Sequence, residues 1–244
     1  MSTLSASELL TAWERGLGQR LMDRALTLLA ATDPHSPRDV LAKLSIGRRD
    51  AGLLSLREKI FGPQLTGLAE CPRCHERLEL NFKAAELRNS SDAADLEELS
   101  VSVEDWRVVF RLPNSDDLMA ISDCRDANMG RALLLQRCIL GIEKNCQDRV
   151  LDDAPANVLE AAVQKMGEAD TLGDVHLALS CPQCGHEWQA PFDIASFLWT
   201  EINAWAHRTL QDVNELAQAY GWREADILAL SPLRRQVYLE LISQ

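Results

Sequence analysis

Basic residues are too few and too scattered in this sequence to form a nucleic-acid-binding face. The chain carries 25 lysines and arginines against 37 aspartates and glutamates, which gives a formal net charge of −12. No basic cluster is longer than the pairs Arg48-Arg49 and Arg234-Arg235. Because binding to phosphates needs a basic face, this balance argues against a DNA- or RNA-binding protein and predicts no nucleic-acid partner.

Long apolar runs and familiar catalytic motifs are also missing. No apolar stretch approaches the roughly 20 residues that cross a bilayer, so no membrane partner is expected. The first residues lack a charged start followed by an apolar run, so no signal peptide is expected, and the predicted localisation is the cytoplasm of a bacterial or host cell. The phosphate-binding, dinucleotide-binding, serine-hydrolase and HExxH patterns are absent, which predicts a protein that is not an enzyme.

Cysteine is uncommon, and four of the seven cysteines form two matching motifs. Residues 71–74 read CPRC and residues 181–184 read CPQC. Each motif places two thiols three positions apart in a tight turn, so that both sulfurs can face one ion. Four thiolates complete a tetrahedral zinc shell with no open position, the usual form of a structural site. The sequence therefore predicts one structural zinc ion held by Cys71, Cys74, Cys181 and Cys184.

Alternatives to this four-thiolate site remain open at the level of sequence. The pairs could be unliganded thiols, or one could be a redox CxxC, although a redox motif usually opens a helix that follows a strand. A nearby histidine, His75, His176 or His186, could replace one thiolate. The remaining cysteines are predicted to be reduced and mostly buried thiols, as in a protein made in the cytosol: Cys124, Cys138 and Cys146.

The residues that follow both motifs repeat the same pattern. Phe82 and Phe192 each lie eight residues after the second cysteine of their motif. Apolar residues alternate with polar ones in both stretches, at Leu78, Leu80 and Phe82 and again at Trp188, Ala190 and Phe192. Period-two alternation is typical of a strand with one buried face. Each motif is therefore predicted to sit at the tip of a hairpin, and the two hairpins together to form a split zinc ribbon.

The predicted fold class is α+β, with helical ends packed around the split zinc ribbon and a mixed α/β insertion between the two knuckles. The expected segments, all in one compact unit, are an N-terminal helical segment (1–63), the first knuckle hairpin (64–88), the α/β insertion (89–173), the second knuckle hairpin (174–193) and a C-terminal helical segment (194–244). In the insertion, a helix that begins after Asp126 is expected to carry Leu133, Leu134, Arg137 and Leu140.

A second internal similarity links the two ends of the chain. Residues 44–49 read LSIGRR and residues 230–235 read LSPLRR, and in both a serine can cap a helix whose first turn carries the arginine pair. Cationic groups there oppose the helix dipole. The arginines could be bonded to acids of the same chain, or they could bind an acidic partner surface. We take Arg48, Arg49, Arg234 and Arg235 as candidate partner-binding residues.

The ends of the chain resemble a known family. Residues 221–235, which read GWREADILALSPLRR, and the following 238–241 are similar to the tail of the T-even-type phage baseplate hub assembly chaperone family. Residues 44–50 and both CPxC knuckles are similar to its zinc-bearing members. Proteins related to this family occur in gene clusters of contractile injection systems. The resemblance covers the two ends and the ribbon, but not the acidic middle of the chain. It implies a non-enzymatic protein that helps to assemble the baseplate hub or stays as a minor baseplate part, and it carries over no catalytic residue.

The leading hypothesis is an assembly factor or minor structural adaptor of a contractile phage tail or injection-system baseplate. Its expected cofactor is zinc, its expected partners are baseplate hub or wedge proteins, and it could stay in the assembled particle. One alternative is a zinc-ribbon nucleic-acid or transcription adaptor, against which the acidic balance counts. Another is a zinc or thiol enzyme, which would need an open coordination position or a thiol of low pKa. The oligomeric state is left undetermined by the sequence.

Overall fold

The computed structural model describes residues 4–33, 35–88 and 98–242. Contacts within the chain divide it into two compact units, one formed by Met1–Pro37 with Ile194–Gln244 and the other by Arg38–Asp193. The division into five segments expected from the sequence stays a prediction. The start of the expected insertion, residues 89–97, lies outside the described residues. No helix in the described ranges is long and apolar enough to span a membrane.

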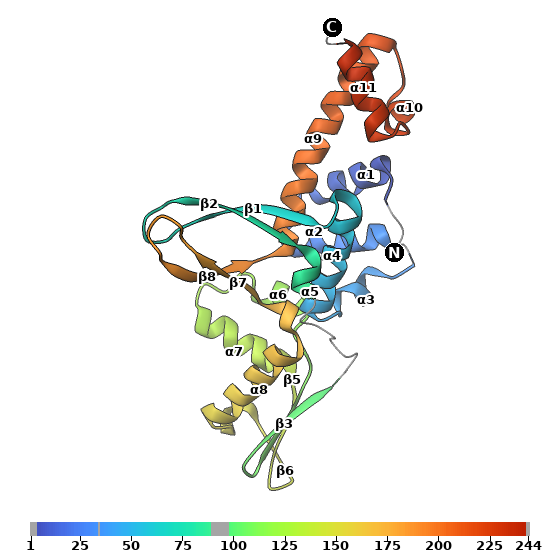
Figure 1. The fold of residues 1–244 in the computed structure, drawn as a ribbon. Coiled ribbons are helices and arrows are strands. Elements are labelled where there is room, and N and C mark those ends of the chain that lie inside the picture. The colour runs from blue at the N-terminus through green and yellow to red at the C-terminus, as the bar shows by residue number, and fades with distance from the viewer. Residues whose placement is uncertain (1–3, 34, 89–97, 243–244) are drawn as a thin grey trace. The chain divides into compact units, whose positions relative to one another are not determined.

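The described part of the first unit is helical. Its elements are α1 (Ala6–Gly16), α2 (Leu21–Thr32), α9 (Ile194–Tyr220), α10 (Glu224–Leu228) and α11 (Pro232–Ile242) (Figure 1). The side chain of Ser5 accepts the N–H of Glu8, and the Glu8 carboxylate accepts the N–H of Ser5. This reciprocal capping box satisfies amides that α1 would otherwise leave unbonded at its start.

Helices α1, α2 and α9 converge on one tryptophan. A Cβ atom on Gly16 would lie 2.4 Å from the ring of Trp199, so α1 can approach α9 this closely only with glycine there. The guanidinium of Arg24 on α2 lies 4.5 Å from the centroid of the same ring, a cation–π contact. Trp13 on α1 also donates its indole N–H to Asn203 of α9 at 3.0 Å. These contacts hold the two ends of the chain together in one helical unit.

The second unit contains two hairpins of similar form and the helices around them. These elements are α3 (Arg38–Ala42), α4 (Ile46–Phe61), β1 (Gln64–Glu70), β2 (Arg77–Lys83), α5 (Ala84–Arg88), β7 (Val175–Ser180) and β8 (Glu187–Phe192). The buried guanidinium of Arg57 on α4 donates to the carbonyl oxygens of Gly62 and Gln64. Because these bonds tie the end of α4 to the start of β1, α4 belongs with the first hairpin rather than with α1 and α2.

Between the hairpins, a four-stranded antiparallel sheet has the order β3-β4-β5-β6. The elements of this region are β3 (Leu99–Val103), β4 (Trp106–Phe110), α6 (Ser115–Ile121), α7 (Ala127–Cys138), β5 (Ile139–Lys144), β6 (Gln147–Arg149), η1 (Leu151–Asp153), α8 (Ala156–Ala169) and η2 (Thr171–Gly173). Alternate residues of β4, Trp106, Val108 and Phe110, are buried in a core that includes Val158, Ala162 and Met166 of α8. The predicted α+β class is confirmed, since helices accompany small antiparallel sheets.

One expectation for this region is wrong. Leu140 does not continue the helix that follows Asp126, because α7 ends at Cys138 and β5 begins at Ile139. Between Leu133 and Ile142, two short apolar runs flank Gln136 and Arg137, and short apolar runs occur in helices and strands alike. Pairing of β5 with β4 on one edge and β6 on the other supplies the hydrogen bonds that decide in favour of a strand.

Candidate metal centre

The two hairpins have the same pairing register. In the first, Leu65 pairs with Phe82, and in the second, Val175 pairs with Phe192. The rings of Phe82 and Phe192 meet edge to face, with centroids 5.4 Å apart and planes at 87°. An edge-to-face aromatic pair stabilises beyond the apolar area that it buries. The two phenylalanines that repeat in the sequence therefore meet in space and join one hairpin to the other.

The turns at the tips of the hairpins also match. The N–H of Cys71 donates to the carbonyl oxygen of Glu76 at 2.9 Å, and that of Cys181 donates to His186 at 2.8 Å. The residue after the second cysteine has a left-handed backbone in both turns, with a φ of 60° at His75 and 67° at Gly185. Glycine adopts this conformation readily, whereas it is uncommon for histidine. The turn is thus retained in the first hairpin despite an unfavourable residue.

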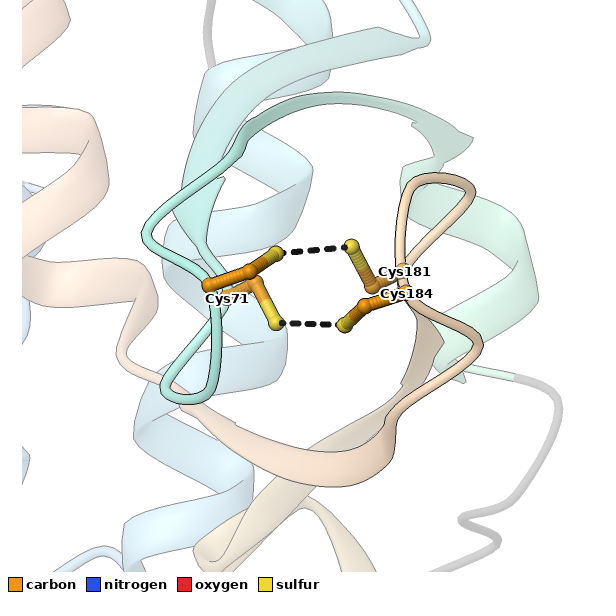
Figure 2. A group of neighbouring side chains, drawn as sticks. Cys71, Cys181 and Cys184 are labelled. Carbon is orange, nitrogen blue, oxygen red and sulfur yellow. Dashed lines mark hydrogen bonds between the residues drawn. The ribbon is translucent and has the colours of Figure 1, made fainter.

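The four motif cysteines come together across the two turns. Their sulfur atoms all lie within 4.8 Å of one another. Along the chain, Cys71 and Cys184 are 113 positions apart, and Cys74 and Cys181 are 107 positions apart. The sulfur of Cys71 is 3.8 Å from that of Cys184, and the sulfur of Cys74 is 3.5 Å from that of Cys181. In Figure 2 the cysteines of the two loops point toward one another. The first cysteine of each turn therefore faces the second cysteine of the other.

This spacing is compatible with a tetrahedral metal site. Four sulfurs bound at about 2.3 Å from a zinc ion lie about 3.8 Å from each other. Cys71 and Cys181 are buried, and Leu78, Leu80 and Trp188 pack against the cluster. The apolar surroundings exclude water from one side of the sulfurs. The four sulfurs can thus hold one ion and would leave it no open position for a substrate.

The electrostatics of the cluster also favour a cation. Burial opposes ionisation of Cys71, but N–H groups of Cys74 and Arg73 and the thiols of Cys74 and Cys181 lower the pKa of Cys71 to about 7. For Cys74, the N–H of Glu76 favours the thiolate, but burial and the three neighbouring cysteine side chains outweigh it and raise its pKa to about 12. Neighbouring sulfurs cannot all carry negative charge without compensation. A bound divalent cation would supply that compensation.

The three candidate histidines make other contacts. His75 Nδ1 lies 2.7 Å from Glu70 Oε1 on the exposed side of the turn, and His176 Nδ1 lies 3.5 Å from Asp174. The ring of His186 stacks on Trp188 with centroids 6.0 Å apart. Among the described residues, the group with metal-binding spacing consists of the four cysteines alone. The geometry therefore favours a four-sulfur donor set over one in which a histidine replaces a thiolate.

The other three cysteines differ in exposure. Cys138 is buried, Cys124 is partly exposed and Cys146 is exposed, so the expectation of mostly buried thiols is correct for Cys138 alone. Cys146 is exposed because it lies in the turn between β5 and β6, where Asn145 and Cys146 both have positive φ, at 52° and 62°. All seven cysteines of the chain are free thiols in the structure.

The two arginine pairs have the same local geometry. Ser45 Oγ accepts the N–H of Arg48, and Ser231 Oγ accepts the N–H of Arg234, both at 3.3 Å. In each pair the first arginine is exposed and the second is buried. Arg49 Nε donates to Asp50 Oδ1 at 2.7 Å, and Arg235 Nη1 lies 4.0 Å from Asp212 Oδ2. The buried member of each pair thus has an acidic neighbour in the chain itself, and the exposed member has a side chain that is accessible at the surface.

The start of α4 carries a buried acidic cluster beside Arg49. Asp170 accepts the N–H of Gly47 at 2.9 Å, and a Cβ on Gly47 would lie 1.9 Å from the Asp170 carboxylate, so the contact requires glycine. Burial raises the pKa of Asp50 to about 6, although Arg49 opposes the shift, and Asp193 and Asp170 add to it. A carboxyl with a raised pKa binds its proton more tightly in the folded than in the unfolded chain.

We therefore predict that Asp50 lowers stability as pH rises. The contribution of Asp50 to the free energy of unfolding is most favourable below about pH 4, where the carboxyl is protonated in the folded and in the unfolded chain. This contribution is lost as the pH rises to about 6, the pKa of Asp50 in the folded chain. The Asp50→Asn variant should lack this loss, which amounts to about 1–3 kcal/mol. Urea unfolding of both proteins between pH 4 and 7 measures the difference. The exposed Asp39→Asn variant is the control, and parallel pH profiles for wild type and Asp50→Asn would contradict the prediction.

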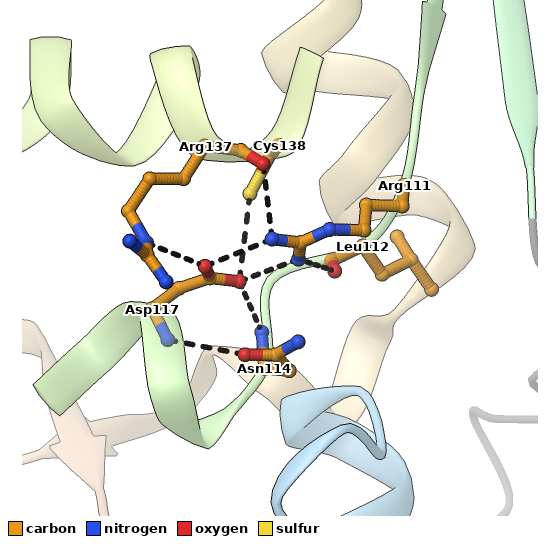
Figure 3. A network of polar contacts seen from close by, with 6 residues as sticks. All are labelled: Arg111, Leu112, Asn114, Asp117, Arg137 and Cys138. Atoms are coloured by element: carbon orange, nitrogen blue, oxygen red, sulfur yellow. Dashed lines mark hydrogen bonds and ion pairs between the residues drawn. The ribbon is translucent and has the colours of Figure 1, made fainter. Parts of the chain in front are cut away.

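A buried carboxylate outside the cysteine cluster organises the insertion. Asp117, which is fully buried, accepts bonds from Arg111 at 2.5 and 2.9 Å and from Arg137 Nε at 2.7 Å (Figure 3). It also accepts the N–H of Asn114 at 3.0 Å. Burial opposes the charge of Asp117, but the bonds from Arg111, Asn114 and Arg137 outweigh it and hold its pKa below the usual range. The network joins the end of β4 to α6 and to the last turn of α7.

The sequence does not predict this network. Its available signal is the capping box of α6, in which Asn114 and Asp117 exchange side-chain and backbone bonds. That signal explains the start of the helix but does not predict the two guanidiniums, which come from Arg111, directly after β4, and from Arg137 in the last turn of α7. The thiol of Cys138 lies 3.9 Å from Asp117, and burial followed by the negative charge of Asp117 raises the pKa of Cys138 to about 11. Cys138 is therefore an unreactive, protonated thiol at neutral pH.

Comparison with known proteins identifies a family. The model of the family described as T4 bacteriophage base plate protein matches residues 19–199 of the 244-residue chain. The matched region contains both cysteine turns and the whole described insertion. No curated protein and no solved structure shows a significant match. The family match agrees with the resemblance to phage baseplate proteins seen at the level of sequence.

Proposed function

Because this chain belongs to the T4 bacteriophage base plate protein family, we propose that it is an assembly factor or minor structural adaptor of a contractile tail or injection-system baseplate. The finer hypothesis is a hub assembly chaperone without enzymatic activity. The observation that carries the proposal is the family match, which spans both cysteine turns. Family membership places the structural or assembly role in the baseplate, and the closed set of four sulfurs supports a structural rather than a catalytic centre.

We propose zinc as the ion in this centre, held by Cys71, Cys74, Cys181 and Cys184. A set of four cysteine sulfurs favours zinc or an iron–sulfur centre over magnesium or calcium, which prefer oxygen ligands. The S–S distances of 3.5 and 3.8 Å suit a single tetrahedral ion. When bound, zinc would supply the positive charge that lets all four sulfurs ionise. The site would then crosslink two hairpins that lie far apart along the chain.

The partners proposed for the chain are baseplate hub or wedge proteins. At least one of the arginine pairs is proposed to contribute to such an interface. The buried members, Arg49 and Arg235, make intramolecular contacts with Asp50 and Asp212. The exposed members, Arg48 and Arg234, are the ones that a carboxylate-bearing partner can reach. Both are presented on the first turn of a helix, where a serine N-cap holds the backbone.

Charge reversal at the exposed arginines tests this function. The chain is co-expressed with the products of neighbouring baseplate genes, and the proteins that co-purify are identified. Arg48→Glu or Arg234→Glu should reduce recovery of a partner roughly tenfold, the effect of about 1.4 kcal/mol, while the melting temperature stays unchanged. The exposed Arg131→Glu is the matched control.

Partner recovery and melting temperature together distinguish a structural role of the exposed arginines from a role in partner binding. Loss of both stability and partner recovery would make the exposed arginines structural. Unchanged recovery in both variants would refute an arginine-dependent interface. If no baseplate protein co-purifies with the wild-type chain, the proposed role itself is refuted.

A further inference from the structure

The four cysteines of the metal centre differ in their access to solvent. Cys71 and Cys181, the first cysteine of each turn, are buried, with 0% and 1% of their surface exposed. Cys74 and Cys184, the second cysteine of each turn, are accessible to solvent at least in part. A small solute can therefore reach one sulfur in each turn, whereas the other is shielded by the apolar side chains that pack against the cluster.

Each accessible sulfur contacts a buried sulfur of the other hairpin. The sulfur of Cys74 lies 3.5 Å from that of Cys181, and the sulfur of Cys184 lies 3.8 Å from that of Cys71. In Figure 2 the dashed lines cross from one loop to the other. Because a disulfide bond is about 2.05 Å long, the sulfurs of each pair need to approach by only about 1.5–1.8 Å to become bonded.

The backbone of each turn holds its two sulfurs toward the opposite hairpin. The N–H of His75 donates to the carbonyl oxygen of Cys71, and that of Gly185 donates to the carbonyl oxygen of Cys181, both at 2.9 Å. These bonds fix the backbone that connects the two cysteines of each motif. A disulfide within one turn would require its sulfurs to rotate away from the sulfurs that they contact in the other hairpin.

We propose that a peroxide oxidises the centre to two disulfides that cross between the hairpins, Cys74–Cys181 and Cys71–Cys184. The peroxide first oxidises an accessible thiolate to a sulfenic acid and leaves as hydroxide. The facing buried thiol then attacks the sulfenic sulfur, so that a sulfur–sulfur bond forms and water leaves. Each disulfide consumes one peroxide, which accepts the two electrons that the two sulfurs give up. This inference concerns the regulation of the proposed zinc centre and rests on the proposed function in that respect.

The crossing disulfides keep the two hairpins linked after the metal has been released. Oxidised sulfurs no longer bind the ion, because the thiolate is the form that ligates a metal. The two disulfides close the same loops of 107 and 113 positions that the metal would close. The melting temperature of the oxidised protein should therefore lie closer to that of the untreated protein than to that of the reduced, metal-free protein.

Disulfide mapping on the full chain tests this pairing. Trypsin cleaves after Arg73, which places Cys71 and Cys74 in different peptides. The second motif has no lysine or arginine between its cysteines, so both remain in one peptide, residues 166–208. The purified protein is treated with hydrogen peroxide, its remaining thiols are blocked, and it is digested without reduction. Both peptides of the first motif should then be joined to peptide 166–208, and tandem mass spectrometry should identify the two proposed pairs.

The variant Cys124→Ser/Cys146→Ser is the control for thiols outside the cluster. It removes the two other cysteines that are not buried, and it should give the same disulfide map as the wild type. A disulfide that joins Cys71 to Cys74 would overturn the proposal, and so would a pairing of Cys71 with Cys181. Oxidation that leaves the two motifs unjoined, or an oxidised protein that melts like the reduced, metal-free one, would also overturn it.

The readouts separate this inference from the proposed function. Zinc release is followed with a metal-sensitive dye, whereas the disulfide map does not depend on which ion was bound. A wild-type chain that contains no zinc but forms the crossing disulfides would refute the zinc centre alone. A zinc-loaded chain that forms its disulfides within each turn would refute the crossing pairs alone. Neither measurement contains a baseplate component, so the co-purification experiment tests the baseplate role independently.

Discussion

Replacing Cys181 with serine is expected to remove the bound metal and to cause the largest loss of stability of any single substitution in the chain. The wild-type protein should contain one zinc ion per chain, and Cys181→Ser should contain almost none, because a buried sulfur ligand is lost from a closed set of four. Structural zinc contributes on the order of 10 kcal/mol of apparent binding free energy in small domains. Elemental analysis and thermal melting followed by circular dichroism measure both effects.

Cys146→Ser provides the matched control for this experiment. Cys146 is an exposed cysteine in the turn between β5 and β6 and lies outside the cluster, so its replacement should change neither the metal content nor the melting temperature. Wild-type protein prepared without chelator that contains no zinc would contradict the prediction. So would a Cys181→Ser variant that retains a full equivalent of metal.

Removal of the metal with a chelator should destabilise the unit Arg38–Asp193 more than the other unit. The cysteines and the hairpins lie in the unit Arg38–Asp193, whereas the helices that pack around Trp199 belong to the other unit. We therefore expect most of the helical circular dichroism signal to survive chelation. The ligand pairs are separated by 107 and 113 residues, and loss of the crosslink frees this long loop in the partly unfolded chain. A melting curve unaffected by demonstrated removal of the metal would refute a stabilising role.

Replacing Asp117 with asparagine is expected to lower the free energy of unfolding by about 3–5 kcal/mol, because the guanidiniums of Arg111 and Arg137 lose the charge that they share. Asp117 has no exposed side-chain surface, so water cannot replace the lost interaction. Asp116→Asn is the control, since this neighbouring aspartate is partly exposed and its loss should cost below about 1 kcal/mol. Equilibrium urea unfolding at pH 7 measures both variants.

The effect of Asp117→Asn should also depend on pH. The pKa of Asp117 is lowered in the folded chain, so its contribution is complete above the pKa of the unfolded carboxyl and is lost as pH falls through the folded value. The difference in unfolding free energy between wild type and variant should therefore shrink in acid. This trend is opposite in sign to that of Asp50, whose pKa is raised. Equal losses for Asp116→Asn and Asp117→Asn, or a difference independent of pH, would contradict the network's role.

The repeated cysteine turns show which structural features a local sequence pattern can predict. Two CxxC motifs, each followed by an alternating apolar stretch, predicted a pair of hairpins, and both hairpins are present in the structure with matching registers. The recurrence of Phe82 and Phe192 is visible in the sequence, but their edge-to-face contact is not. The sequence also predicted a serine cap before each arginine pair. It did not separate the exposed arginine from the buried one, because helix phase relative to a neighbouring element sets exposure.

The sequence by itself determined the motifs whose physical basis is local. These are the two cysteine turns, the alternating strands beside them, the serine-capped helices and the acidic charge balance. Only the tertiary structure decided that the apolar run around Leu140 enters a sheet, since the hydrogen bonds of β5 come from β4 and β6. Only the tertiary structure brought Arg111 and Arg137 to Asp117, because the end of β4 and two helices must pack together before these charges can meet.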